Sequence, residues 1–232
     1  MSMKTTLLAA GLALAASGFA AAAPQDPARA PIVVELFQSQ GCSSCPPANA
    51  NVNALAARPD VLALSYGVTY WDQLGWKDTF ASKAYTDRQW AYSRGLRHKQ
   101  VWTPQVVING ATDVVGTKLP EIEAAARKVP LTGGPRLSVA GDVLTVGAGK
   151  AAKADVWLVR YDPAVVQVPV KRGENTGKTL PHRNVVREMT RLGAYGGKAM
   201  TYRLPANADP RLKTAILVQA GPGGPILAAT KT

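Results

Sequence analysis

The chain has 232 residues, of which 47% are hydrophobic and 18% charged, a composition that excludes a wholly disordered protein. Two cysteines are too few for a small protein held together by disulfides, and with only two histidines they leave few soft ligands for several metal ions. The net charge is +12, and the length allows one or two domains with a sizeable core.

The first residues are typical of a signal peptide. Lys4 supplies a positive charge, residues 7–16 are apolar, and small residues at 20–23 precede Pro24. We predict cleavage after Ala22, since the apolar run is short for a membrane span of roughly 20 residues, although a membrane anchor is the alternative. The sequence therefore predicts an exported protein, periplasmic or secreted, with no stable membrane insertion.

Charge divides the remaining chain into two regions. Residues 23–130 carry eleven basic and nine acidic side chains, whereas residues 131–232 carry fifteen basic and six acidic ones. A Gly-Gly-Pro stretch at 133–135 marks the boundary, because these residues end regular structure. We expect two domains, 23–130 and 131–232.

The first region alternates strand and helix patterns. Its expected strands are 32–37, 61–68, 105–108 and 112–115, and its expected helices are 46–57, 83–97 and 117–128. Ser82 and Thr117 are the predicted helix caps, and Asn109-Gly110 is a hairpin turn. The initial β-α-β order predicts parallel strands, and the hairpin adds an antiparallel edge.

The second region has short alternating segments instead. Expected strands are 136–140, 142–146, 155–161, 165–170, 200–204, 214–219 and 225–228, and 185–192 fits a strand or a short helix. Many short strands at regular spacing predict an antiparallel β-rich module. The fold class is therefore α/β with this module at the C-terminus.

The most informative motif is Cys42-Ser43-Ser44-Cys45, a C-x-x-C between a strand and a helix. A thiol at a helix N-terminus lies near aligned backbone N–H groups, which lower its pKa. We expect Cys42 to be the exposed attacking sulfur and Cys45, one turn deeper, to resolve the mixed disulfide. No cofactor beyond this redox-active disulfide is expected.

Two other interpretations of the cysteines stay open. A passive disulfide is one, but closing a loop of about four residues contributes only about 2 kcal/mol. Metal handling is the other, because Cu(I) accepts two thiolates, whereas a closed zinc site needs four ligands and only His98 and His182 remain.

A second motif begins at Thr103-Pro104, directly before an expected strand. A proline is allowed at the first position of a strand. Most X-Pro bonds are trans, but the upstream C-x-x-C favours a cis bond that would leave the Thr103 backbone free beside the strand end. We predict Thr103 and Pro104 near the two sulfurs.

These motifs resemble known proteins. The β-α-β-α-β-β-α order with C-x-x-C and T-P-Q-V resembles the thioredoxin fold. The stretches at 35–49, 70–80, 103–110 and 172–187 resemble a bacterial secreted thioredoxin-like family, domain-of-unknown-function family 1223. The resemblance implies Cys42 as nucleophile, Cys45 as resolving thiol, Pro104 as cis-proline, and protein thiols or disulfides as partners. Ser43-Ser44 differs from the usual thioredoxin dipeptides, so the resemblance does not imply a redox potential.

Several other polar residues are candidates. The three aromatic residues of the stretch 70–78, with Asp72 and Asp78, could form a substrate-facing lip near Cys42, or Trp71 and Trp76 could cover the core. Asp72 could also accept a proton from Cys45. Glu35, inside a predicted buried strand, could relay protons to Cys45 or could face outward.

The C-terminal region adds a basic stretch and a polar cluster. The stretch between 171 and 191 favours an anionic partner or a solvated face, and we expect no nucleic acid because the chain is exported and aromatic residues are sparse there. The polar cluster comprises Glu174, Asn175, His182, Arg183 and Asn184. It could support the interface to the first region, or His182 could activate Cys42 as in a cysteine hydrolase.

Overall fold

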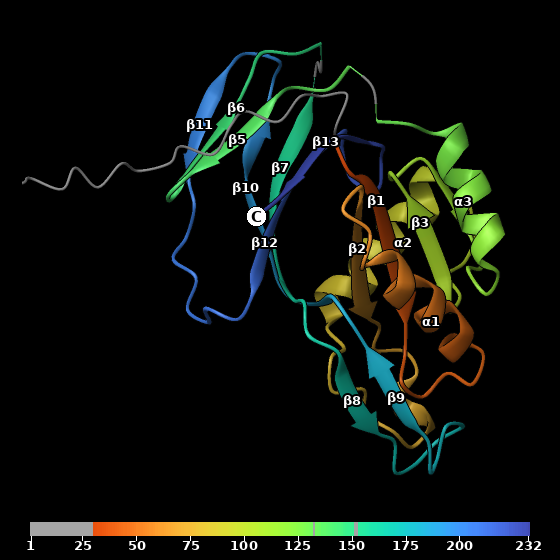
Figure 1. Ribbon diagram of the computed structural model, residues 1–232. Helices are drawn as coiled ribbons and strands as arrows, with labels where there is room; N and C mark the ends of the chain where they lie inside the picture. The colour runs from red at the N-terminus through yellow and green to blue at the C-terminus, as the bar shows by residue number, and fades with distance from the viewer. Residues whose placement is uncertain (1–29, 132, 151–152) are drawn as a thin grey trace, which may run out of the picture.

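A computed structural model describes residues 30–131, 133–150 and 153–232. The predicted signal peptide therefore lies outside the described residues. Thirteen strands and three α-helices follow in chain order: β1 (Ile32–Gln38), α1 (Cys45–Leu55), β2 (Val61–Gly67), α2 (Lys83–Gly95), β3 (Gln105–Ile108), β4 (Thr112–Val114), α3 (Leu119–Lys128), β5 (Leu137–Ala140), β6 (Val143–Val146), β7 (Ala154–Asp162), β8 (Val166–Pro169), β9 (Thr179–His182), β10 (Val185–Tyr195), β11 (Met200–Arg203), β12 (Lys213–Gln219) and β13 (Ile226–Lys231). The architecture is mixed α/β (Figure 1).

One eight-stranded sheet runs through the molecule in the order β13-β12-β7-β10-β2-β1-β3-β4. The first region forms one half, and its predicted pairing is confirmed: β1 and β2 are parallel, and β3 and β4 follow as an antiparallel edge. Helices α1 and α3 pack on one face, where their buried residues join those of β1 and β3. Helix α2 packs on the opposite face through Tyr85 and Tyr92.

The second region extends the same sheet. Strand β10 lies parallel to β2 through a single register pair, Val185 with Ser65, and the Ser65 N–H donates to the Asn184 carbonyl at 3.0 Å. Strands β7, β12 and β13 continue antiparallel from β10. A three-stranded sheet, β11-β6-β5, packs against this half, and β8 and β9 form a separate hairpin beside α1 (Figure 1).

The hydrophobic core crosses the predicted boundary at 131. The cluster under α2 contains Leu64 and Tyr66 of β2 together with Val159, Leu217 and Ile226 of the second region. Both regions therefore bury apolar surface against each other as well as within themselves.

Most predicted elements are confirmed to within a few residues, including α2 with Ser82 as its cap. Three differ. Helix α3 begins after Lys118 rather than Thr117, and β9 is not predicted by the sequence. Residues 185–195 form a strand, the first of the two alternatives for this segment, and it is longer than expected. No helix within the described part of the chain is long and apolar enough to cross a membrane.

Candidate functional site at the Cys42–Cys45 disulfide

The two cysteines lie where β1 turns into α1. Cys42 and Cys45 form a disulfide, with their Cα atoms 5.5 Å apart. Cys45 is the first residue of α1, and the prolines after it occupy the first turn, where a missing N–H costs no helical hydrogen bond. The Cys45 N–H donates to the Cys42 carbonyl at 3.2 Å, so the motif is wound into a tight turn at the helix start.

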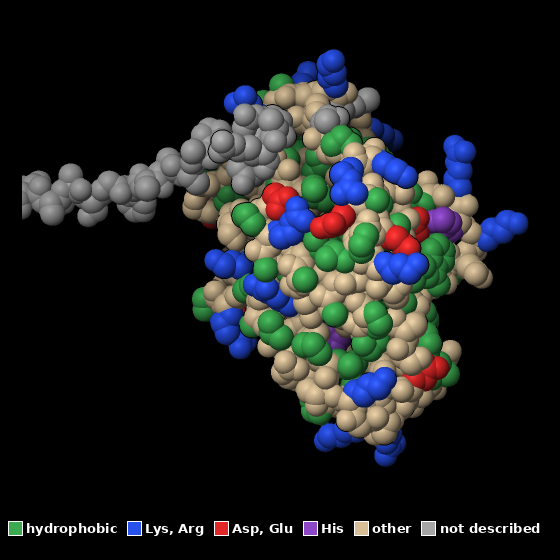
Figure 2. Space-filling model, turned by 45° about the vertical axis from the view of Figure 1, so that its right-hand side comes forward, with side chains coloured by type: hydrophobic (Ala, Val, Ile, Leu, Met, Phe, Trp, Pro, Cys, Tyr) green, Lys and Arg blue, Asp and Glu red, His purple; other side chains and the backbone are tan. Residues whose placement is uncertain are grey.

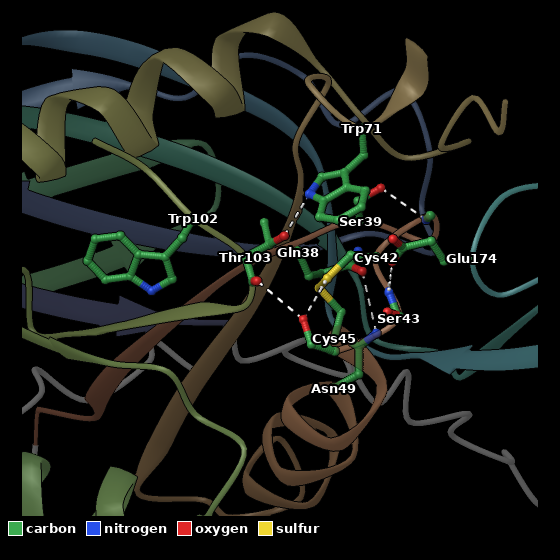
Figure 3. Close-up of a disulfide and its surroundings, with 12 residues drawn as sticks. Gln38, Ser39, Cys42, Ser43, Cys45, Asn49, Trp71, Trp102, Thr103 and Glu174 are labelled. Carbon is green, nitrogen blue, oxygen red and sulfur yellow. Dashed lines mark hydrogen bonds between the residues drawn. A yellow bond between two sulfur atoms is a disulfide. The ribbon is translucent and has the colours of Figure 1, made fainter. Parts of the chain in front are cut away.

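The Thr103–Pro104 segment lies beside this turn, as predicted, and its peptide bond is cis. The Ser44 hydroxyl donates to the Thr103 carbonyl at 3.4 Å. The Trp71 indole N–H donates to the Thr103 hydroxyl at 2.7 Å, and its ring lies next to the disulfide (Figure 3). The structure thus brings together Cys42, Cys45, Thr103 and Pro104.

The prediction that Cys42 is exposed was wrong. Cys42 is 0% exposed and Cys45 is 1% exposed, whereas Ser43 and Ser44 between them are exposed. The reason lies far along the chain, because the loop between β8 and β9 packs over the C-x-x-C turn. The buried Asn175 side chain donates to the carbonyls of Gln40, at 3.0 Å, and Cys42, at 2.8 Å.

The predicted polar cluster of the second region does support the interface to the first. Glu174 accepts a hydrogen bond from the Ser43 N–H at 2.9 Å, and the Asn184 side chain donates to the Ala63 carbonyl at 2.8 Å. The Arg183 backbone N–H donates to the side-chain oxygen of Asn53 at 3.0 Å. These contacts fix the β8–β9 hairpin against α1 and β2.

A buried polar group lies one helical turn below Cys45. Asn49 shares the buried face of α1 with Cys45, and its side-chain nitrogen is 3.2 Å from His182 Nδ1. Burial lowers the pKa of His182 to about 4, so the imidazole is neutral at neutral pH. Asn49 Oδ1 and His182 Nε2 have no hydrogen-bond partner within the described residues. The predicted alternative of His182 activating Cys42 is not what this geometry shows, because His182 bonds Asn49 and Cys42 is in a disulfide.

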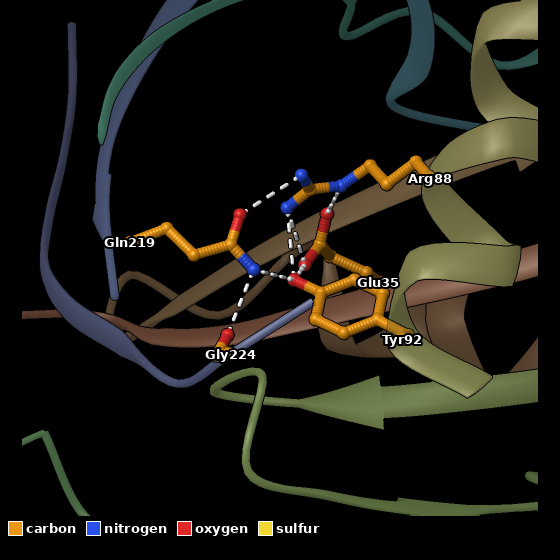
Figure 4. A network of polar contacts seen from close by, with 5 residues as sticks. All are labelled: Glu35, Arg88, Tyr92, Gln219 and Gly224. Carbon is orange, nitrogen blue, oxygen red and sulfur yellow. Dashed lines mark hydrogen bonds and ion pairs between the residues drawn. The ribbon is translucent and has the colours of Figure 1, made fainter. Parts of the chain in front are cut away.

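Glu35 is buried, but it does not serve Cys45. It points to the α2 face of the sheet, where Arg88 donates to its two carboxylate oxygens at 2.8 and 3.0 Å and the Tyr92 hydroxyl also bonds it (Figure 4). Gln219 of β12 completes this network by accepting from Arg88 at 3.1 Å. Since α1 covers the opposite face, a proton relay from Glu35 to Cys45 is excluded by the alternation of side chains along β1.

The loop after β2 supports the C-x-x-C turn from another side. Trp76 donates from its indole nitrogen to Gln40 Oε1 at 2.9 Å, and the buried Asp78 accepts from the Gln40 N–H at 2.7 Å. Burial raises the pKa of Asp78 to about 6, although the backbone N–H groups of Gln40 and Phe80 lower it. Asp72 accepts from the Asp78 N–H rather than contacting a cysteine. The sequence pattern included Asp78 among the carboxylates of this stretch, but it did not predict that Asp78 is buried and holds the Gln40 N–H.

Surface charge is mixed on one face of the molecule, and the metal-ligand residues are dispersed in the part of the chain that the structure describes. Lys and Arg side chains are spread over the face in Figure 2, with Asp and Glu among them, rather than gathered into one patch. Within residues 30–131, 133–150 and 153–232, no three His, Cys, Asp or Glu side chains form a group that could hold a metal ion.

Comparison with known proteins identifies the family. Residues 33–219 match the family model described as protein of unknown function, DUF1223. A crystal structure of a protein from Agrobacterium tumefaciens is 34% identical, with a TM-score of 0.73, over 86% of this chain and 92% of that one. HBP35 of Porphyromonas gingivalis is 11% identical, with a TM-score of 0.54, over 88% of this chain and 75% of that one, which is a likeness of fold alone. No curated protein matches the chain. The chain thus belongs to the DUF1223 family, the family that its cysteine, aromatic and Thr-Pro motifs resemble.

Proposed function

We propose that this protein is an exported thiol–disulfide oxidoreductase with a thioredoxin-like core, acting through Cys42 and Cys45. The observation that carries the proposal is the disulfide at the first turn of α1 with the cis Thr103–Pro104 bond beside it. The strand order β2-β1-β3-β4, with α1 and α3 on one face and α2 on the other, supports the thioredoxin-like description. The signal-peptide pattern supports export to an oxidising compartment.

The proposed chemistry needs only the two sulfurs and a substrate disulfide or dithiol. In the reducing direction the Cys42 thiolate attacks one substrate sulfur, forms a mixed disulfide and expels a substrate thiolate. Cys45 then loses its proton and attacks the Cys42 sulfur. The Cys42–Cys45 bond forms, the second substrate thiolate leaves, and two electrons have passed to the substrate. The reverse sequence oxidises a substrate dithiol.

Access to Cys42 is the main structural requirement of this proposal. The sulfur is buried under Trp71, Thr103 and the β8–β9 loop, whereas Ser43 and Ser44 are exposed at the rim (Figure 3). A substrate therefore approaches across the two serines, and the loop or Trp71 moves for the sulfur to react.

Cysteine variants of the full chain test the proposal. Cys42→Ser should abolish disulfide exchange, and Cys45→Ser should accumulate a mixed disulfide at Cys42, because no resolving thiol remains. If the cysteines instead carry copper, both variants should lose bound Cu(I) and neither should trap an adduct. That second result would overturn the oxidoreductase proposal.

A further inference from the structure

A carboxylate and a hydroxyl lie at the C-x-x-C turn, and they affect a negative charge on Cys42 in opposite ways. The Glu174 carboxylate accepts the Ser43 N–H at 2.9 Å, and hydrogen bonds from the side chain and the backbone of Ser43 lower its pKa, so it is ionised at neutral pH. The Ser44 hydroxyl oxygen is 3.3 Å from the Cys42 sulfur. Glu174 thus brings a negative charge to the residue next to Cys42, and Ser44, whose hydroxyl donates to the Thr103 carbonyl here, lies within hydrogen-bond reach of the sulfur.

The position of Glu174 is fixed by its neighbours in the loop. Asn175 is 0% exposed and is held by two backbone carbonyls of the C-x-x-C turn and by the Lys178 ammonium, which donates to its side-chain oxygen at 3.0 Å. Gly173 has a φ of +79°, and a Cβ there would lie 3.3 Å from the Trp76 Cβ. The loop therefore lies against the site at both ends of Glu174.

These contacts have opposite effects on a Cys42 thiolate. The prolines in the first turn of α1 have no N–H to offer a thiolate, and the Glu174 carboxylate accepts the Ser43 N–H and adds like charge close by. On reduction the Ser44 O–H can turn from the Thr103 carbonyl to the Cys42 sulfur, and a hydrogen bond there favours the thiolate.

Other charged or titratable groups belong to the elements that pack against the turn. They are Lys171, Arg172 and Lys178 of the β8–β9 loop, Asp72 and Asp78 of the loop after β2, and His182 of β9. Of these, Asp78 bonds the Gln40 N–H and His182 is neutral, while Lys171 and Arg172 are exposed. None of the hydrogen bonds to the Cys42–Ser44 segment comes from these six side chains.

We infer that the second region sets the acidity of the reactive thiol: Glu174 is a positioning residue that raises the pKa of Cys42, and Ser44 opposes it. The inference deepens the proposed function and rests on it. Removing the Glu174 charge should make the Cys42–Cys45 pair more oxidising, because a more stable thiolate favours the reduced form. The β8–β9 loop thereby both covers the site and adjusts its redox balance.

Titration of Cys42 tests the inference without a substrate. In the full chain carrying Cys45→Ser, the ultraviolet absorbance of the thiolate is followed against pH with and without Glu174→Gln, whose amide oxygen can still accept the Ser43 N–H. We expect the acid dissociation constant of Cys42 to rise about three-fold or more at low salt, and the difference to shrink at high salt. Ser44→Ala should shift it in the opposite direction. The control is Glu123→Gln, because Glu123 of α3 pairs with Arg58, which follows the end of α1 opposite the cysteines.

Each outcome bears on one claim. An unchanged or lower dissociation constant in Glu174→Gln, with the fold retained by circular dichroism, overturns the inference. A three-fold or larger rise in both Glu174→Gln and Glu123→Gln also overturns it, because the effect is then net charge and not the loop contact. Equilibration with glutathione is a separate readout of the redox equilibrium. A ten-fold change in the thiol–disulfide equilibrium constant corresponds to a 29.6 mV change in reduction potential. A pair that never exchanges with glutathione refutes the proposed function even where the titration behaves as expected.

Discussion

At the scale of single residues, burial determines which polar groups can do chemistry. Glu35 illustrates this, because its carboxylate is satisfied by Arg88 and Tyr92 on the α2 face and is separated from Cys45 by the sheet. His182 is the opposite case, a neutral imidazole under α1 whose Nε2 has no partner among the described residues. The first group stabilises the fold as an ion pair, and the second makes stability depend on pH.

Glu35→Gln should destabilise the protein without impairing exchange. Removing one partner of a buried ion pair leaves the other charge uncompensated, so we expect the free energy of unfolding in urea to fall by about 3 kcal/mol. The exchange rate of the folded fraction should stay within about two-fold of wild type. The double variant Glu35→Leu/Arg88→Met should recover much of the lost stability. Loss of exchange in folded Glu35→Gln would contradict this expectation and support a proton relay from Glu35 to Cys45.

His182 should make the wild type lose stability as the pH falls. Its pKa is about 4 when folded and 6.5 when unfolded, so between these values the unfolded chain binds the extra proton. The neutral His182 makes its full contribution to the free energy of unfolding above pH 6.5. That contribution declines by about 3 kcal/mol as the pH falls towards 4. Asp78, with a pKa raised to about 6, acts in the opposite direction over nearly the same range.

The difference between wild type and His182→Gln isolates this effect, since Asp78 is common to both. We expect the stability advantage of the wild type to shrink between pH 7 and pH 4.5 in urea titrations. An advantage that is constant across this range would mean that His182 titrates normally.

At the scale of elements, the β8–β9 hairpin explains why sequence reasoning placed Cys42 wrongly. The strand before the motif and the helix after it follow from local patterns, the cis Thr103–Pro104 bond follows from pairing two motifs along the chain, and all three are confirmed. The cover comes from Asn175, 133 positions away, and β9 is a four-residue strand containing a proline, which gives a weak strand signal. Long-range contacts of this kind leave no periodicity to read.

Asn175→Ala should loosen this cover. The change leaves two carbonyls at the C-x-x-C turn without their donor, and we expect the unfolding free energy to fall by about 1–3 kcal/mol. Alkylation of reduced Cys42 should accelerate about ten-fold, because less free energy is then needed to open the loop. Asn207→Ala serves as the control, since Asn207 bonds only the Leu212 carbonyl in an exposed loop. Equal alkylation rates in Asn175→Ala and wild type would show that another group limits access.

At the scale of the whole molecule, the two regions share one sheet and one core. Strand β2 is buried at all seven positions, which is typical of a strand with a neighbour on each side. The apolar run of β2 predicts a buried strand, but it does not predict β10 as the neighbour. The pairing of these two strands rests on one register position between residues 120 apart. The composition shift at 131 therefore marks a change of element type within a continuous sheet.

A fragment ending at residue 130 should not fold on its own. It would expose the edge of β2 and the apolar side chains that meet Val159, Leu217 and Ile226. We expect aggregation or a circular dichroism spectrum of an unfolded chain for residues 23–130, against a cooperative transition for residues 23–232. A soluble, cooperatively unfolding fragment would establish the predicted domain boundary instead.

Exchange of Cys42 and Cys45 with external thiols is the central requirement of the proposed function. The direct measurement is the intact mass of the full chain carrying Cys45→Ser after incubation with oxidised glutathione, with the modified residue located by peptide mapping. We predict a single glutathione adduct on Cys42, and release of that adduct when Cys45 is present. Failure of Cys42 to form the adduct in Cys45→Ser protein that is shown to be folded would contradict the proposed oxidoreductase and leave the disulfide as a structural feature.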